Sequence, residues 1–138
     1  MDTEELLKHS NELSRNTLME TLSITFVAIG EDFITAKMPV NHRVHQPDGV
    51  LHGGATFALA ESVGSFASFL FNKRKDHVVR GIEMSGNHIK SVRDGHVYAK
   101  AKAIHFGKTT QVWDIKVTDD NDHLISSIKI TTVTLPKK

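Results

Sequence analysis

The chain has 138 residues, of which 39% are hydrophobic and 24% charged, and its formal net charge at neutral pH is +1. This length predicts one domain over residues 1–138 with a sizeable core, and the near-neutral charge argues against a nucleic-acid-binding protein. The sequence has no cysteine, which excludes a disulfide framework and a thiol nucleophile.

The N-terminal segment does not resemble a targeting signal. It is acidic and amphipathic, whereas a signal peptide begins with basic residues followed by an apolar run. No apolar run approaches the roughly 20 residues that a membrane-spanning helix needs, so we expect a cytoplasmic protein. Residues 2–13 have helical spacing with Thr3 as the candidate N-cap, and residues 16–20 predict a short second helical turn.

The next two segments predict a β-hairpin. Residues 22–29 are apolar and β-branched, and residues 33–40 alternate between two faces as a half-buried strand does. Residues 30–32, Gly-Glu-Asp, supply the turn between them.

The centre of the chain predicts one long helix, from about Gly53 to Phe71. A loop precedes it, marked by Pro47 and the turn dipeptide Asp48-Gly49. The helical stretch contains no proline, and apolar or small residues lie on every side of it. This composition predicts a helix that is buried on all sides.

One carboxylate, Glu61, lies in this apolar helix. Ser65 follows four residues later and therefore shares a helix face with it. An unpaired buried carboxylate is costly, so we interpret Glu61 as a functional residue. The alternative is a structural ion pair with an arginine or lysine from elsewhere in the chain.

Four further strands are predicted after the helix. Residues 77–90 and 124–135 form two long strands, and residues 97–103 and 111–118 alternate between two faces. The alternation over 97–103 turns small alanines inward, Ala103 among them, which leaves room for the central helix.

Glycines interrupt these strands at informative places. Gly81 and Gly86 are expected at bulges or at close approaches of another group. The dipeptide Asp94-Gly95 predicts a hairpin turn. Short connections between strands favour an antiparallel sheet, and the element order predicts an α+β fold in which this sheet wraps around one long helix.

The start of the central helix, His52-Gly53-Gly54, is the second candidate for chemistry. The first N–H groups of a helix have no internal partner and lie at the positive end of its dipole, and glycine allows a ligand oxygen to come close. This arrangement suits the stabilisation of an oxyanion.

The distance between the two candidates predicts a dimer. Gly53 and Glu61 are eight residues apart, or about 12 Å along a helix axis, whereas a reacting carbonyl must lie about 3 Å from both groups. Two antiparallel helices from two copies of the chain bring the start of one beside Glu61 of the other. We therefore expect a homodimer with its site at the interface.

Metal and serine-hydrolase chemistry have little support in the sequence. Nine histidines are present, and His42 and His45 lie three residues apart, but there is no H-E-x-x-H motif and no neighbouring carboxylate on the N-terminal side. The G-x-S-x-G motif of serine hydrolases is also absent. We expect no metal and no redox cofactor.

Three strings carry a family resemblance: Q-P-x-G-x-L-H-G-G-A from Gln46, A-L-A-E-S-x-G-S from Ala58 and H-F-G-x-x-x-Q-V-W from His105. Together they resemble the hotdog-fold acyl-CoA thioesterases of the PaaI superfamily. The most similar branch includes a 1,4-dihydroxy-2-naphthoyl-CoA thioesterase of menaquinone synthesis and the proofreading thioesterase of enterobactin synthesis. The resemblance covers most of the chain and implies hydrolysis of a thioester on a hotdog fold.

The resemblance implies roles for the candidates at the site. Glu61 is expected to act as general base or as nucleophile, and the Gly53 backbone N–H to donate to the thioester oxygen. His52 and Gln46 are expected near the thioester; a lone histidine before a helix is more often a cap or a packed residue. Ser65 would orient water or Glu61, or serve only close packing.

The CoA half of the substrate needs cationic and polar contacts for its phosphates. The resemblance implies that it runs across two segments and one glycine. Taken singly, the lysines of this set are also typical of a solvated surface. The expected residues are Gly81, His88, Ile89, Lys90, Ser91, His105, Gly107, Lys108, Thr109 and Thr110.

Several functional alternatives stay open at this point. An aromatic acyl-CoA, with dihydroxynaphthoyl-CoA first, is the leading substrate, and medium-chain acyl-CoA is also compatible. The others are a thioesterase for acyl groups on a carrier protein, a non-catalytic acyl-CoA-binding module and a hotdog dehydratase. Asp48 stands where an aromatic residue is more usual in the resembled branch, and a dimer of dimers is the expected assembly.

Overall fold

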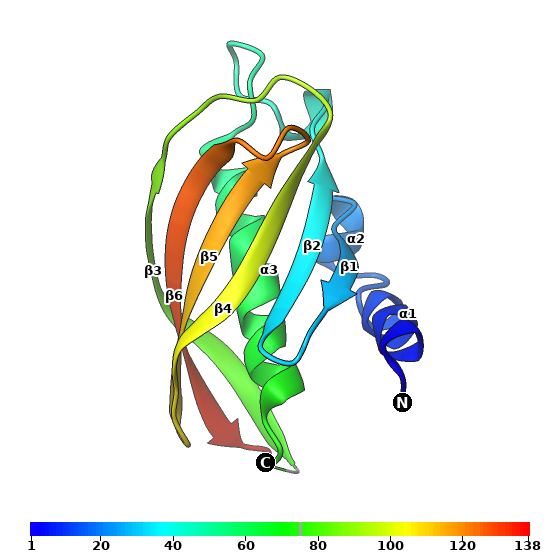
Figure 1. Cartoon of the computed structure of the whole chain (residues 1–138), viewed down its shortest axis with the longest axis vertical. Coiled ribbons are helices and arrows are strands. Elements are labelled where there is room, and N and C mark those ends of the chain that lie inside the picture. Colours follow the sequence, from blue (N-terminus) through cyan, green and yellow to red (C-terminus); the bar gives the residue numbers. More distant parts are fainter. Residues whose placement is uncertain (75) are drawn as a thin grey trace.

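The computed structural model describes residues 1–74 and 76–138, in which six strands form one antiparallel sheet in the order β1-β2-β4-β5-β6-β3. The sheet curves around the long helix α3, with the shorter helices beside β1 (Figure 1). This is the expected α+β hotdog fold. The helices are α1 (Thr3–Leu13), α2 (Leu18–Thr21), the 3-10 turn η1 (His42–Val44) and α3 (Gly53–Phe71); the strands are β1 (Thr25–Ile29), β2 (Phe33–Pro39), β3 (His77–His88), β4 (His96–Phe106), β5 (Thr110–Asp119) and β6 (Leu124–Pro136).

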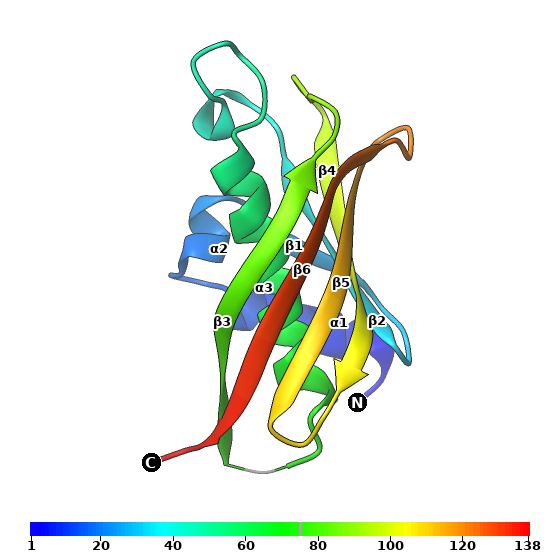
Figure 2. The same ribbon diagram turned by 90° about the vertical axis from the view of Figure 1, so that its left-hand side faces the viewer.

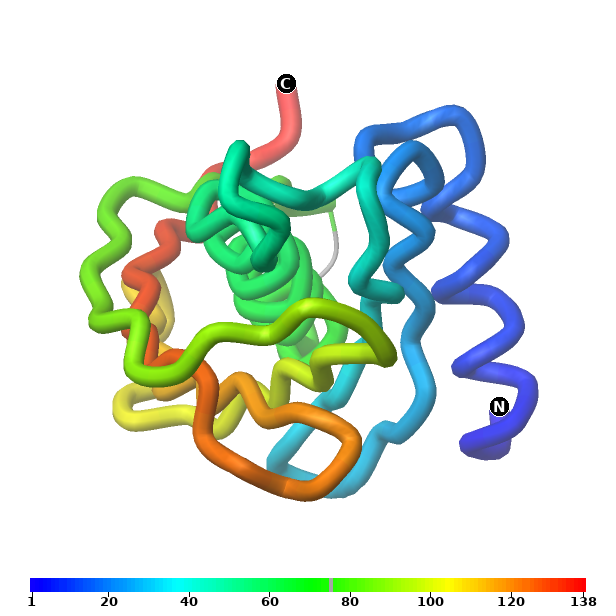
Figure 3. The backbone as a smooth tube through the Cα atoms, turned by 90° about the horizontal axis from the view of Figure 1, so that it is seen from above, coloured from blue at the N-terminus to red at the C-terminus, as the bar shows by residue number. Residues whose placement is uncertain are grey.

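Seen along its axis, α3 lies within the curve of the sheet, and α1 lies outside that curve (Figure 3). One face of α3, which includes Leu59, Val63 and Ala67, is fully buried. Gly64 allows the closest approach, because a Cβ there would lie 2.5 Å from Cγ2 of Ile130. The contact with the sheet therefore depends on a small residue at the middle of the helix.

The opposite face of α3 is open, so the expectation of burial on all sides is wrong. Glu61 and Phe69 are exposed, and Ser62 and Ser65 are only partly covered. A single sheet can cover one face of a helix and no more. An apolar helix with one uncovered face is therefore left with surface for another group to bury.

By length and composition alone α3 would be able to cross a membrane, since its 19 residues include a window of mean hydropathy 1.3. The expectation that no apolar run approaches this length is therefore wrong. Its packing inside the sheet explains the apolar composition, and one such helix is weak support for a membrane span.

Most element boundaries agree with the sequence-based expectations, with corrections at the turns. The α1 helix is capped by Asp2, whose side chain accepts from the Glu5 N–H, rather than by Thr3. Strand β4 runs on to Phe106 through an irregularity after Ala103, and Ala103 is exposed rather than inward.

The hairpin expected at Asp94-Gly95 is also wrong. Gly95 does adopt a positive φ of 75°, but β3 and β4 lie apart in the sheet, with β5 and β6 between them. The dipeptide shapes the connection into β4 without pairing two adjacent strands. The hairpin expected between the first two strands does form, as β1 and β2 pair antiparallel.

A buried chain of hydrogen bonds ties α3 to the sheet. The Trp113 indole N–H donates to Ser68 Oγ at 2.6 Å, and that hydroxyl lies 2.7 Å from Thr132 Oγ1. Thr132 then donates to Gln111 Oε1 at 2.8 Å. Because each polar group finds a partner, these buried side chains fix the helix position without an unsatisfied donor or acceptor.

The two edge strands of the sheet, β1 and β3, differ in what covers them. At β1, the Asn11 side chain of α1 accepts from the Phe26 N–H at 2.8 Å and donates to the Phe26 carbonyl at 3.1 Å, which occupies that edge. The other edge is β3, which pairs with β6 and with no further strand of the described chain. Ile82, at the irregularity after Gly81, is 59% exposed on this strand.

Candidate active site

A pocket of about 220 Å³ lies at the N-terminal end of α3. The helix contributes Gly53 and Thr56 to it, the preceding loop contributes Gln46, and the end of β3 with the segment after it contributes residues 88–92. The start of β6 adds Ile125 and Ser126, so three parts of the chain that are distant in sequence, around residues 46–56, 88–92 and 125–126, meet here. We call this the helix-start pocket.

The Gly53 N–H is the donor that this pocket offers. The Gly54 N–H donates to His52 Nδ1 at 2.8 Å, and the N–H groups of Ala55 and Thr56 donate to the His52 carbonyl. Within the described residues the Gly53 N–H has no acceptor. This donor at the positive end of a long helix can bind a developing oxyanion.

His52 caps α3, as the alternative interpretation of this residue expected. Since Nδ1 accepts a backbone N–H, the ring proton lies on Nε2 when the imidazole is neutral. His52 is exposed, so the Nε2–H can donate to a ligand while Nδ1 holds the cap. The cap and a ligand contact are thus compatible in one side chain.

Glycine is required at position 53 by its neighbour. A Cβ there would lie 2.5 Å from Nε2 of His88. The His88 ring is held by a 2.7 Å hydrogen bond between Nδ1 and Ser126 Oγ and by an edge contact with Phe57. The imidazole is therefore fixed against the helix start.

Gln46 lies in a tight turn at the mouth of the helix-start pocket. The Gly49 N–H donates to the Gln46 carbonyl at 2.9 Å, with Gly49 at a φ of 81°. The Gln46 side chain donates to Asp48 Oδ1 at 2.8 Å. Asp48 therefore fixes the carboxamide, which leaves its second N–H hydrogen for a ligand.

Glu61 lies in a different place, a groove of about 580 Å³ along the open face of α3. Its carboxylate makes no ion pair with any residue that the structure describes, so the alternative of a structural ion pair has no support. We call this the Glu61 groove. Its lining residues are Leu18, Met19, Ala58, Glu61, Ser62, Ser65, Phe66, Phe69, Val78, Val79 and Arg80.

Gly81 faces the carboxylate from β3. A Cβ at this position would lie 3.2 Å from Glu61 Oε2 and 3.7 Å from Ser65 Oγ. Glu61 and Ser65 therefore share one small space, as their spacing of four residues predicts. Gly81 was expected to contact CoA, and the structure places it beside the carboxylate.

The helix-start pocket and the Glu61 groove share none of their described lining residues. Gly53 and Glu61 remain eight residues apart along one continuous helix. One chain therefore holds the two candidate groups, the Gly53 N–H and the Glu61 carboxylate, in two separate pockets.

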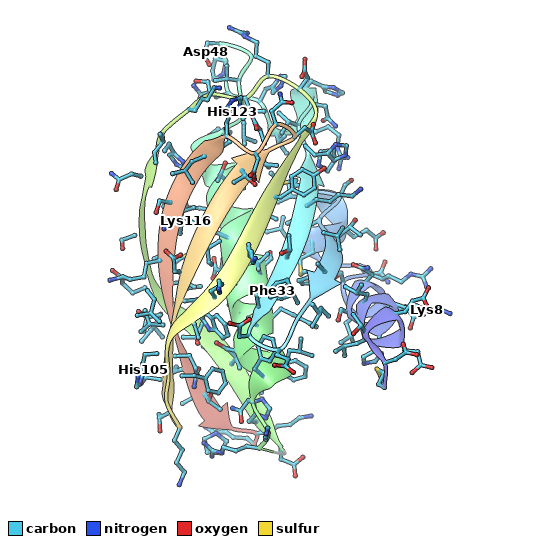
Figure 4. All side chains as sticks on the ribbon, in the orientation of Figure 1. Lys8, Phe33, Asp48, His105, Lys116 and His123 are labelled. Carbon is cyan, nitrogen blue, oxygen red and sulfur yellow. The ribbon has the colours of Figure 1, made fainter. Side chains whose placement is uncertain are left out.

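The residues expected to bind CoA are likewise divided. His88, Ile89, Lys90 and Ser91 line the helix-start pocket, whereas His105 to Thr110 form the hairpin between β4 and β5. In Figure 4, Asp48 is labelled at the top of the molecule and His105 in its lower half.

Three hydrogen bonds to backbone carbonyls hold the β4–β5 hairpin in place. Gln111 Nε2 donates to the Gly107 carbonyl at 3.0 Å, and Arg74 donates to the Lys108 carbonyl at 3.1 Å. The Thr134 N–H donates to the Thr109 carbonyl at 2.8 Å. The hairpin tip is therefore a fixed polar surface rather than a loose loop.

The apolar lining of the Glu61 groove was not predicted from the sequence. Leu18 and Met19 belong to a four-residue helix, too short to show a periodic pattern. Phe66 and Phe69 belong to the apolar stretch of α3, for which burial was expected. The available signal was the spacing of Phe69, eight residues after Glu61, because steps of four residues stay on one helix face.

Nor does the structure bring the histidines into a metal site. Among the described residues no group of three or more His, Asp or Glu is placed to hold a metal ion. His45 instead makes a 2.8 Å hydrogen bond from Nε2 to the Arg93 carbonyl.

Comparison with known proteins identifies the family. Residues 48–126, which include α3 and most of the sheet, match the model of the thioesterase superfamily. The chain belongs to the thioesterase superfamily. It is therefore a thioester hydrolase with a hotdog fold.

Three similar proteins illustrate the match. The 1,4-dihydroxy-2-naphthoyl-CoA hydrolase of Escherichia coli K12 is 40% identical over 94% of each chain. The crystal structure of a mutant thioesterase PA1618 from Pseudomonas aeruginosa superposes with a TM-score of 0.91 at 40% identity, over 94% of both chains. The crystal structure of the thioesterase HI1161 from Haemophilus influenzae also superposes with a TM-score of 0.91. It is 39% identical, and the match covers 94% of this chain and 90% of the HI1161 chain.

Proposed function

We propose that this thioesterase hydrolyses acyl-CoA thioesters in the cytoplasm as a homodimer with two composite sites. The observation that carries the proposal is the division of the chemistry along α3: among the described residues, a free Gly53 N–H lies in one pocket and an unpaired Glu61 carboxylate in another. In each site, the helix-start pocket of one protomer would face the Glu61 groove of its partner.

The free edge of β3 provides the contact that such a dimer needs. Two β3 strands that pair edge to edge across a two-fold axis perpendicular to them run antiparallel, and β3 lies beside α3 in each chain. The two α3 helices would then also run antiparallel, with the start of one beside Glu61 of the other. The exposed Ile82 and the part of the open face of α3 between Gly53 and Glu61 would be buried in the same contact.

The chemistry divides between the two protomers. The Gly53 N–H and the His52 and Gln46 side chains would polarise the thioester carbonyl and stabilise the oxyanion. The partner's Glu61 would either remove a proton from the attacking water or attack the carbonyl carbon to form a mixed anhydride, which water then hydrolyses. In both routes the C–S bond breaks, the thiolate of CoA leaves, and it takes up a proton.

We propose an aromatic acyl group, with 1,4-dihydroxy-2-naphthoyl-CoA as the first substrate to test and a place in menaquinone synthesis. The 40% identity to the E. coli hydrolase of that thioester supports this choice. The CoA moiety would contact His88 to Ser91 of one protomer and the β4–β5 hairpin of the other. Two dimers would pair through their outer sheet faces, where Ile104 is 60% exposed.

The first test is a thiol-trapping assay on naphthoyl-, benzoyl-, phenylacetyl- and medium-chain acyl-CoA, with a carrier-protein thioester as a further substrate. We expect wild type to hydrolyse the aromatic CoA esters best and Glu61→Gln to lose roughly a hundredfold or more. Preference for the carrier-protein thioester would replace the CoA assignment. Full activity of Glu61→Gln would remove Glu61 from the mechanism.

A complementation experiment tests whether the site is shared. Glu61→Gln and Gln46→Ala are each expected to be impaired, but a dimer of one of each has one site with both wild-type residues. Random re-pairing of equal amounts should therefore recover about a quarter of wild-type activity. The double variant in one chain, mixed with either single variant, is the control that forms no such site. No recovery in the mixture would contradict a site built from two protomers.

A further inference from the structure

The Glu61 groove has a wall that does not belong to α3 or to the sheet. Leu18 and Met19 of α2 line the groove together with Phe66 and Phe69 of α3. Figure 2 shows α2 alongside α3, on the side away from the sheet. The groove is therefore open to solvent and bounded by two helices and the start of β3.

The α2 helix is firmly attached even though it has only four residues. Thr17 caps it by accepting the Met19 N–H at 3.2 Å, and the Met19 carbonyl accepts from the Ile24 N–H at 2.8 Å. At its other end Arg43 donates to the Thr21 carbonyl. The backbone that carries Leu18 is thus held from both sides.

The side chain of Leu18 does not pack in the hydrophobic core. It is 61% exposed, whereas its neighbour Met19 packs against the core. A large apolar side chain on a fixed backbone, lining a groove that holds the reactive carboxylate, is placed to contact whatever enters that groove.

The wall formed by α3 is aromatic. The Phe66 ring lies 4.6 Å from Phe26 and 5.9 Å from Phe69, and Phe69 in turn lies 5.5 Å from His77. Packing against Phe26 fixes Phe66, while Phe69 is 44% exposed. Aromatic rings prefer offset or edge contacts with other rings, so this wall suits a planar aromatic group.

Charge decides which half of a thioester enters. Among the described residues that line the groove, Arg80 is the one cationic side chain, and its guanidinium donates to the Val79 carbonyl. A phosphate-bearing group would need several cationic donors, whereas an acyl group needs apolar surface. The acyl half is also the half bonded to the carbon that Glu61 acts on.

We propose that Leu18 and Phe69 are specificity-determining residues that clamp a planar aromatic acyl group in the Glu61 groove. This inference rests on the proposed acyl-CoA hydrolysis and extends it. Leu18 sets the width of the groove from α2, and Phe69 provides the face on which the ring packs. The size of the accepted acyl group therefore depends on a side chain outside the central helix.

The test varies Leu18 and compares substrates of increasing width: hexanoyl-, benzoyl- and naphthoyl-CoA. Leu18→Trp narrows the groove and should lower kcat/KM for naphthoyl-CoA relative to hexanoyl-CoA by on the order of tenfold. Leu18→Ala widens the groove and should lower kcat/KM for benzoyl-CoA more than for naphthoyl-CoA. Because Leu18 is exposed, neither change should lower the melting temperature appreciably.

The matched control is Leu13, which is 50% exposed on α1 and does not line the groove. Leu13→Trp and Leu13→Ala should leave the ratios of kcat/KM unchanged. Equal effects of the Leu18 changes on all three substrates, with wild type active, would overturn the clamp alone. An inactive wild-type protein would instead overturn the proposed function on which the clamp rests.

Discussion

At the scale of single residues, His52 illustrates how one side chain can serve both the fold and the proposed site. Its Nδ1 caps α3, and its exposed ring leaves Nε2 available beside the free Gly53 N–H. In the sequence the cap and the ligand contact are competing interpretations. The geometry makes them compatible, because the two ring nitrogens point in different directions.

This dual use predicts that the two roles can be separated. His52→Asn keeps an acceptor for the Gly54 N–H, whereas His52→Ala removes it and should cost about 1 kcal/mol of unfolding free energy. Both changes remove the Nε2–H donor, and both should lower kcat by about a hundredfold. Urea denaturation and the thioesterase assay measure the two effects; a fully active His52→Asn protein would limit His52 to capping.

Two glycines of β3 allow effects on catalysis and effects on stability to be distinguished. A Cβ on Gly81 meets the Glu61 carboxylate at 3.2 Å, which a flexible side chain can relieve by moving. A Cβ on Gly86 meets the Ser127 carbonyl at 2.7 Å, and that backbone atom cannot move easily.

We therefore expect Gly81→Ala to lower kcat by displacing Glu61 while the melting temperature stays close to wild type. Gly86→Ala should lower the melting temperature with little change in kcat of the folded fraction. Thermal denaturation and initial rates on the same samples distinguish them. A destabilised but normally active Gly81→Ala protein would show that Gly81 serves the sheet and not the carboxylate.

At the scale of elements, periodicity predicted the strands and the long helix well, because alternation and apolar content are local properties. It failed where the answer depends on distant pairing. Asp94-Gly95 has turn chemistry, but only the sheet order reveals that β3 and β4 lie apart. The open face of α3 could not be predicted either, since composition does not say how many sides a sheet covers.

The turn between β5 and β6 carries the element-scale prediction. The pKa of Asp119 is held below its ordinary value of 3.8, chiefly because its carboxylate accepts the His123 backbone N–H. The Asn121 N–H donates to the same oxygen at 2.9 Å. A lowered pKa in the folded state means that the ionised carboxylate stabilises the fold.

This contribution should be complete above pH 3.8 and disappear as the pH falls through the lowered folded-state pKa. Asp119→Ala should therefore have a lower melting temperature than wild type at pH 7, and the difference should shrink at about pH 3. Asp119→Asn is the control, since its amide oxygen can accept the same N–H groups without a charge. A difference that is independent of pH would assign the effect to turn geometry alone.

At the scale of the whole molecule, the separation of the Gly53 N–H from the Glu61 carboxylate could be predicted from the sequence because the rise of a helix is fixed. Gly53 and Glu61 are separated by eight residues of one helix in any fold that keeps this helix, so the expectation of a second copy needs only the sequence. The apolar groove could not be predicted. The groove depends on where α2 packs, and the sequence of this four-residue helix does not predict its place beside α3.

The buried contact between Trp113 and Ser68 provides an intrinsic fluorescence probe of the folded state. Trp113 is the single tryptophan of the chain, is 1% exposed and donates its indole N–H to a helix hydroxyl. Its fluorescence therefore reports the seating of α3 on the sheet: emission should shift to longer wavelength when the helix leaves and water reaches the ring. The Glu61 groove and the helix-start pocket do not include this ring, so the optical signal separates loss of fold from loss of catalysis in any variant, without a label.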